Sequence, residues 1–321
     1  MNRKMRIAML VAAGLGLVVM AGCGSQAQMS LNLKPGDATT YKVTTETIKD
    51  FKFEQPSMEP PKVKEDQTKT LAVVTFDQKV DAVDPKAGAI ATITIKGIEY
   101  IVTDKNSVKF DFNSAREEDM KKPFAQLIGK SYKINLGRDG KVSVLDAAEA
   151  RKISDAGYDG KLAQAFLADE RIVERHQIMA MPEGDPITVT SGKGWNKVVP
   201  SPAGLLAPKN YEKTYTLEKV EGGKDNPVVF VKMVGKESKE PVKEGTKTMD
   251  SMGPFAKMFD TQESYEGQLV LETGTGTVRK YQEKLVVTYL ASEAPADQKP
   301  DKGPDTLTMR FTYNFDLAKV Q

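Results

Sequence analysis

The sequence predicts a mainly β (α+β) fold, in which curved antiparallel sheets resembling a half-barrel surround a central helical insert. Three observations point to it: long stretches of alternating apolar and polar residues, turn residues that join them directly, and an alanine-rich segment with a longer period between them. Alternation with a period of two is typical of strands with one buried face. Short turns favour antiparallel pairing, because parallel strands need a long crossover connection.

The first alternating stretch begins at residue 39. Tyr41, Val43, Phe51 and Phe53 share one parity, which predicts a strand that is buried on one face. Prolines and many charges fill residues 55–70, so this segment is predicted to form a long exposed loop.

The next stretches, residues 71–83 and 90–102, are predicted to form a hairpin. In the returning strand the apolar parity changes at Gly97, where a β-bulge would keep both halves on the same face of the sheet. Residues 108–112 add a short strand. Asp139-Gly140 is a strong turn signal and predicts a further hairpin.

The central segment, residues 146–181, is predicted to be helical, with one helix over 146–154 and another over 161–181. Alanines dominate the first part, and Leu162 and Phe166 fall on one face of the second. Pro182 follows directly and is predicted to end the insert.

The remainder returns to alternation. Strands are predicted over residues 211–220, 228–234, 265–273 and 278–290, each pair joined by a glycine-containing turn. Residues 307–317 alternate most regularly of all, so we expect this last strand to lie in the core.

These elements divide the chain into a leader (1–22), a lipidated cysteine with its tether (23–36), an N-terminal antiparallel β region (37–182) and a C-terminal antiparallel β region (183–321). We expect the two β regions to pack as one unit around a common core. Two separate β-sandwich lobes are the alternative. The two ends of the chain have a similar order of strands and turns. This similarity indicates either a diverged repeat of one β-meander or two unrelated hairpins.

The leader has the three parts of a secretory signal: a basic start, an uncharged apolar run over residues 7–20 and small residues before a cysteine. The run is shorter than the roughly 20 apolar residues of a membrane-spanning helix. Met20-Ala21-Gly22-Cys23 resembles the lipobox of bacterial lipoproteins. The resemblance implies cleavage before Cys23 and a diacylglyceryl group on its sulfur. A cleaved signal with a chance cysteine is the alternative.

Two or three acyl chains on Cys23 would hold the protein firmly on a membrane, since one chain alone holds only marginally. We therefore expect an exported, lipid-anchored protein. By analogy with the lipoprotein family, Gly24 in place of aspartate favours the outer membrane, facing the periplasm, if the source cell has two membranes. Cys23 is the only cysteine, so no internal disulfide is possible.

Charge and composition narrow the possible partners and cofactors. Three of the 46 basic residues would leave with the leader, which leaves 43 against 44 acidic residues and argues against nucleic-acid binding. His176 is the only histidine, so no histidine-based metal or catalytic site is expected, and no cofactor. Its helical spacing from Ile172 and Met179 indicates a histidine packed in the core.

Two further features resemble sites that could carry chemistry. Trp195 follows Gly192 and Gly194 and is predicted to be a large anchor in the core, with sugar stacking as the alternative. The acidic residues 117–119 are predicted to begin a solvated helix, where acids favour the helix dipole. Their alternative role is a carboxylate pair for glycoside hydrolysis.

The strongest ligand-binding candidate is a group of flexible thioethers and aromatic rings on one charged loop: Met249, Met252, Phe255, Met258 and Phe259. Such side chains suit a lid over an apolar pocket. The alternative is that they cover the end of the hydrophobic core.

The chain after the leader is similar to exported bacterial lipoproteins of unknown function. The shared features are residues 31–37 (LNLKPGD), residues 127–130 (LIGK) before Asp139-Gly140, and Gly194-Trp195. The resemblance implies no reaction and no catalytic residues. We expect a binding or scaffolding module of the cell envelope, without catalysis, that contacts an envelope protein, polymer or lipid. The alternatives are a carrier of an apolar ligand or lipid in a concave β face, lidded by residues 249–259, and a carboxylate-based hydrolase.

Overall fold

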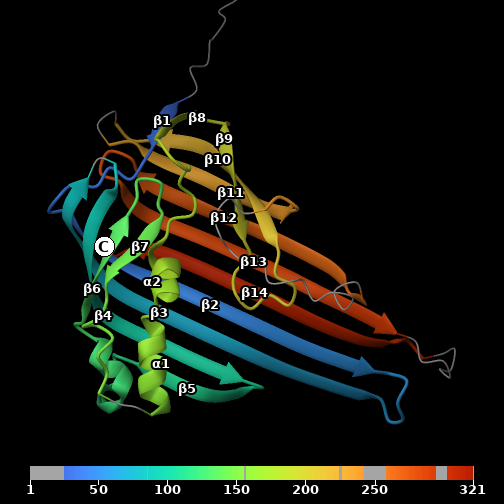
Figure 1. The fold of residues 1–321 in the computed structure, drawn as a ribbon. Helices are drawn as coiled ribbons and strands as arrows, with labels where there is room; N and C mark the ends of the chain where they lie inside the picture. Colours follow the sequence, from blue (N-terminus) through green and yellow to red (C-terminus); the bar gives the residue numbers. More distant parts are fainter. Residues whose placement is uncertain are drawn as a thin grey trace, which may run out of the picture.

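The computed structural model describes residues 25–84, 86–154, 157–223, 226–241, 258–293 and 302–320. Within these residues a 12-stranded antiparallel sheet forms the body of the molecule, in the order β7-β6-β4-β3-β2-β14-β13-β12-β11-β10-β9, with β5 paired to β4 (Figure 1). The sheet curves without closing on itself, since β7 and β9 end the ladder. The predicted mainly β fold with a curved antiparallel sheet is confirmed.

The strands of this sheet are long in its centre and short at its edges. They are β2 (Ala38–Gln55), β3 (Lys62–Asp84), β4 (Gly88–Asp104), β5 (Ser107–Asn113), β6 (Ser131–Leu136), β7 (Val142–Asp146), β9 (Gly194–Pro200), β10 (Asn210–Glu221), β11 (Val228–Ser238), β12 (Asp260–Glu272), β13 (Thr277–Glu293) and β14 (Asp305–Lys319). A separate two-stranded sheet pairs β1 (Gln26–Met29) with β8 (Ile187–Thr190). The first strand of the described residues therefore begins at Gln26, inside the stretch predicted to be a tether.

The two β regions meet at the centre of one sheet. Strand β14 pairs with β2 along its whole length, from Thr306 opposite Glu54 to Lys319 opposite Tyr41. Two separate lobes would have no such ladder. The regular alternation of β14 therefore does mark a central strand, as predicted.

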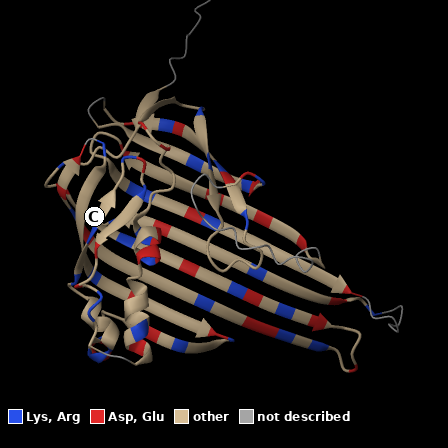
Figure 2. Ribbon diagram, viewed as in Figure 1, with Lys and Arg blue, Asp and Glu red and all other residues tan. Residues whose placement is uncertain are grey.

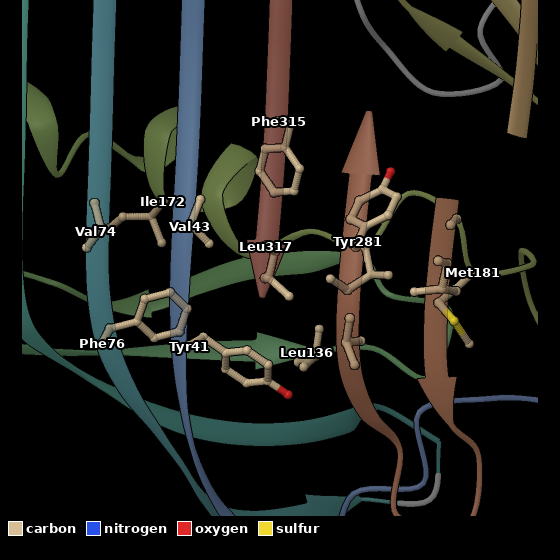
Figure 3. Packing of buried hydrophobic residues seen from close by; sticks show 14 of the residues in the cluster. Tyr41, Val43, Val74, Phe76, Leu136, Ile172, Met181, Tyr281, Phe315 and Leu317 are labelled. Atoms are coloured by element: carbon tan, nitrogen blue, oxygen red, sulfur yellow. The ribbon is translucent and has the colours of Figure 1, made fainter. Parts of the chain in front are cut away.

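The sheet has two faces. On its inner face Val43 of β2 lies opposite Leu317 of β14, and on its outer face Glu46 lies opposite Asn314. The inner face is largely apolar and packs against α2 and β6 (Figure 3). The outer face is polar, and its charges pair across strands: Lys69 lies 2.6 Å from Glu46, whose second oxygen accepts a 2.8 Å hydrogen bond from Asn314. The sheet is thus buried on one side only.

The parity change in β4 is a bulge, as predicted. Gly97 lies opposite Thr75 and Ile95 lies opposite Phe76, so Lys96 is the extra residue. Ile93, Ile95 and Ile98 are all buried as a result. One bulge therefore keeps both halves of the strand on the inner face.

Residues 55–70 do not form the long loop that the prolines predicted. Only residues 56–61 form the turn, and the charged residues 62–70 belong to β3. Cross-strand partners explain why charges are tolerated there: Gln67 donates a 2.8 Å hydrogen bond to Asp50, and Lys52 lies 3.5 Å from Glu65. Figure 2 shows these charged segments toward the ends of the central strands that lie away from the helices, which is the uncovered end of the sheet.

The helical insert is where the sequence placed it, but it is shorter. Its helices are α1 (Tyr158–Phe166) and α2 (Asp169–His176), and two short 3-10 helices, Glu117–Lys121 and Pro123–Leu127, precede β6. The predicted helix over 146–154 is wrong. Asp146 ends β7 and accepts a hydrogen bond from the backbone of Ala148, and the buried Ala147 and Ala150 anchor turns instead.

The predicted helix over 161–181 is divided after Phe166 and stops at His176. Beyond it the chain docks on the β6–β7 hairpin, where the backbone N–H of Ile178 donates a 3.0 Å hydrogen bond to Gly140. Ile178 and Met181 are buried at the two ends of a turn, in which the backbone N–H of Met181 donates a 3.1 Å hydrogen bond to Ile178. Tertiary contacts therefore replace the last helical turn, and they hold α2 across the inner face of the sheet.

Candidate ligand-binding cavity

A cavity of about 760 Å³ lies on the inner face, between α2 and the strands of the C-terminal half. Aromatic rings from β12, β13 and β14 form its floor: Tyr265, Tyr281, Tyr313 and Phe315. Helix α2 and the segment after it, with Glu174 and Met179, form one wall, and the edge strand β9 forms another. The lining combines apolar rings with charged groups.

A buried ion pair lies at the floor of this cavity. Lys213 Nζ donates hydrogen bonds of 2.6 and 2.7 Å to the two carboxylate oxygens of Glu283, and only 1% of Lys213 is exposed. Tyr265 Oη donates a 2.8 Å hydrogen bond to the same carboxylate, and Tyr281 Oη also donates to it. Lys213 Nζ also lies 4.5 Å from the ring centroid of Tyr265. The carboxylate is thus fully surrounded by donors.

The electrostatics of this cluster follow from its burial. Burial lowers the pKa of Lys213, and the carboxylate of Glu283 opposes that shift. Burial and the nearby Glu283 raise the pKa of Tyr265 and of Tyr281 well above the ordinary value. Both phenols therefore stay protonated and remain donors.

Two glycines make room for the ion pair, because Lys213 and Glu283 lie on strands that are not neighbours. Gly235 of β11 is opposite Lys213, and Gly267 of β12 is opposite Glu283. A Cβ atom at Gly235 would lie 2.9 Å from the Tyr265 side chain, and one at Gly267 would clash with the backbone oxygen of Gln282. The lysine side chain can therefore reach across two strands.

The wall formed by α2 contributes a second polar group. Arg171 donates a 2.8 Å hydrogen bond to Glu174, which in turn accepts a 3.4 Å hydrogen bond from Tyr313 Oη. Burial and the nearby Glu174 raise the pKa of Tyr313 well above the ordinary value. Helix α2 is thus tied to the floor of the cavity.

The structure describes only two residues of the predicted lid, Met258 and Phe259. Met249, Met252 and Phe255 lie outside the described residues, as does Cys23. Met258 is 60% exposed, whereas Phe259 packs edge-on against Tyr289 with a centroid distance of 6.2 Å and joins the core. Neither is among the described residues that line the cavity.

The other features singled out in the sequence have structural roles. His176 is buried and shares a 2.6 Å hydrogen bond with Tyr132, so its assignment to the core is confirmed. Trp195 stacks on Tyr215 with a centroid distance of 5.5 Å. Asp119 is buried and paired with Arg116 and Lys122 at the 3-10 helix. Its carboxylate therefore stabilises a turn.

Sequence reasoning missed Lys197, Lys213 and Glu283. Each has a signal that could have found it: a charged residue on the apolar parity of an alternating strand. Lys213 stands between Tyr211 and Tyr215 in this way. Such a residue must lie inside the fold, where a charge requires a partner.

Within the described part of the chain, no helix is long and apolar enough to cross a membrane. The described residues also contain no group of three or more histidine, cysteine, aspartate or glutamate side chains placed to hold a metal ion.

Comparisons with known proteins do not assign a family. No protein-family model matches the chain, and no curated protein is similar to it in sequence. A solved structure of lipovitellin, described by its lipid–protein interactions, is 10% identical with a TM-score of 0.38, over 90% of this chain and 25% of that chain. OpdL of Pseudomonas aeruginosa is 8% identical with a TM-score of 0.21, over 89% of this chain and 99% of that chain. This chain therefore spans about a quarter of the lipovitellin chain, and likenesses at these TM-scores carry no argument about function.

Proposed function

We propose that this chain is a binding protein of the cell envelope that holds one small amphipathic molecule in the inner-face cavity and catalyses no reaction. The observation that carries the proposal is the cavity itself. Its volume of about 760 Å³ lies within the range of small-molecule sites. Rings at its floor suit an apolar group, and charged side chains on its walls suit a polar one.

The hydrogen bonding at the floor supports binding over catalysis. Glu283 accepts hydrogen bonds from Lys213, Tyr265 and Tyr281, so its lone pairs are already used. A general base needs a free lone pair within reach of the substrate proton. The buried cluster therefore shapes the cavity and leaves the ligand unchanged.

Filling the cavity tests this proposal. Ala203 is exposed and lines the cavity, so Ala203→Trp is expected to weaken binding of the neutral fluorescent amphiphile N-phenyl-1-naphthylamine by about tenfold or more, because the indole would occupy the space. Fluorescence titration of the purified protein gives the affinity. Ala165→Trp, on the exposed side of α1 away from the cavity, is the matched control. Equal affinity in both variants, or no binding by the unsubstituted protein, would contradict the proposal.

We also propose that a lipid on Cys23 anchors the protein to the membrane on which it works. The support is the lipobox-like motif, together with the first strand, which begins at Gln26 and leaves little chain between lipid and fold. The sheet would therefore lie close to the membrane surface. A ligand drawn from that membrane would have a short path to the cavity.

Replacement of the cysteine tests the anchor. Cys23→Ser is expected to move the protein from the membrane pellet to the soluble fraction of the cell envelope, since no thioether can form on serine. Fractionation by ultracentrifugation followed by immunoblotting measures the distribution. Ser25→Ala keeps the cysteine and should remain in the pellet. Membrane retention of the Cys23→Ser protein would rule out this anchor.

A further inference from the structure

Lys197 is a buried cation without a hydrogen-bond partner. It lies in the middle of the edge strand β9, faces the cavity, and is 7% exposed. Its Nζ has no hydrogen-bond partner among the described residues. The carboxylate of Glu183 lies 3.9 Å away, beyond hydrogen-bond distance, and Glu183 is itself exposed.

The surroundings of Lys197 increase the cost of its charge. In the register of β9 and β10, Lys197 lies directly opposite Lys213, and like charges in that position destabilise a sheet. Glu283 cannot serve as a second partner for Lys197, because it already accepts hydrogen bonds from Lys213, Tyr265 and Tyr281. Burial lowers the pKa of Lys197; the charges of Glu183 and Asp139 oppose that shift, and those of Lys141 and Lys213 add to it.

Two other cations that line the cavity, Lys213 and Arg171, differ from Lys197 because each has a close carboxylate partner. Lys213 is paired with Glu283, and Arg171 is paired with Glu174. A lysine with a purely structural role would be expected to have such a partner, since a buried unpaired ammonium is costly. Lys197 lacks such a hydrogen-bond partner, and it faces the space in which a ligand would be held.

We propose that Lys197 binds the anionic head group, carboxylate or phosphate, of the molecule held in the cavity. This inference rests on the proposed function and names the class of ligand. Oxygens of the head group would supply the hydrogen bonds that Lys197 lacks, as charge-assisted contacts. The apolar part of the ligand would then lie over the rings of Tyr281 and Phe315 on the floor.

Competition against the neutral probe N-phenyl-1-naphthylamine tests the inference with three ligands of equal chain length: dodecanoate, dodecyl phosphate and dodecanol. The unsubstituted protein is expected to bind at least one of the anions about tenfold more tightly than the alcohol. Lys197→Met should remove that preference, so that all three competitors bind with similar affinity, and Lys197→Arg should retain it. Lys193→Met, on the exposed turn before β9, is the matched control and should change nothing.

The outcomes separate the inference from the proposed function. Tighter binding of dodecanoate identifies a carboxylate ligand, and tighter binding of dodecyl phosphate identifies a phosphate; both support the role of Lys197. If the probe binds but all three competitors have equal affinity, or if Lys197→Met keeps the anion preference, the inference is wrong and the cavity remains a binding site. If the probe itself does not bind, the proposed function fails. Thermal unfolding checks that Lys197→Met is folded, because removing a buried charge that lacks a hydrogen-bond partner should not lower the melting temperature.

Discussion

Replacing Glu283 by glutamine is expected to lower the free energy of unfolding by about 3–5 kcal/mol. The substitution keeps the size of the side chain but removes its charge, and Lys213 is then a buried ammonium without a counterion. Tyr265 and Tyr281 would also lose the carboxylate to which they donate. Chemical denaturation of the purified protein, followed by circular dichroism, measures the loss.

An ion pair on the outer face provides the matched control for Glu283. Lys69 and Glu46 are 2.6 Å apart on neighbouring strands, but their side chains are 31% and 21% exposed. Glu46→Gln should therefore cost less than about 1 kcal/mol, because water can solvate the remaining lysine. The double variant Lys213→Met with Glu283→Leu should recover most of the stability. A loss below about 1 kcal/mol for Glu283→Gln would contradict the burial of the pair.

Replacing Phe311 by alanine is expected to lower the free energy of unfolding by a similar amount, about 3–5 kcal/mol. Phe311 is 3% exposed on the inner face of β14, opposite Val287 of β13, and the loop at Gly204 passes over its ring. Truncation would leave a cavity in the centre of the sheet that its neighbours cannot fill. Equilibrium unfolding in urea measures the change.

Phe53 is the control for Phe311. It lies on the same face of the neighbouring strand β2, opposite Leu307, but is only half-buried. Phe53→Ala should cost less than half as much, since a side chain already in partial contact with water loses less transfer free energy. Equal losses for the two phenylalanines would mean that the uncovered end of the sheet is packed as tightly as its centre.

Local patterns predicted much of this fold because a half-buried strand has its own signature in the sequence. The alternation around Phe311 identified a core strand, and the parity change at Gly97 identified a bulge. Prediction failed where distant contacts outweigh local preference. Ala147 and Ala150 read as helix formers, but burial against other elements fixes them in turns.

The site was harder to predict than the fold. Lys213 and Glu283 are 70 residues apart in the sequence and come from β10 and β13, so no local pattern shows that they meet. The alternation in the sequence shows that both side chains point to the buried face of the sheet. It does not show the order of the strands, and that order decides which buried charges lie close enough to pair. Lys197 has the same parity signal, and only its neighbours distinguish it from a paired lysine.

The place of β14 between β2 and β13 has a consequence for how the chain folds. Residues 41–54 pair with residues 306–319 from the other end of the chain. Because distant pairings form slowly, we expect this central ladder to form late in folding. Until then β2 and β13 each expose an unpaired edge that can recruit a foreign strand. We therefore expect chains shortened before residue 305 to aggregate, and newly made chains to depend on chaperones that shield these edges.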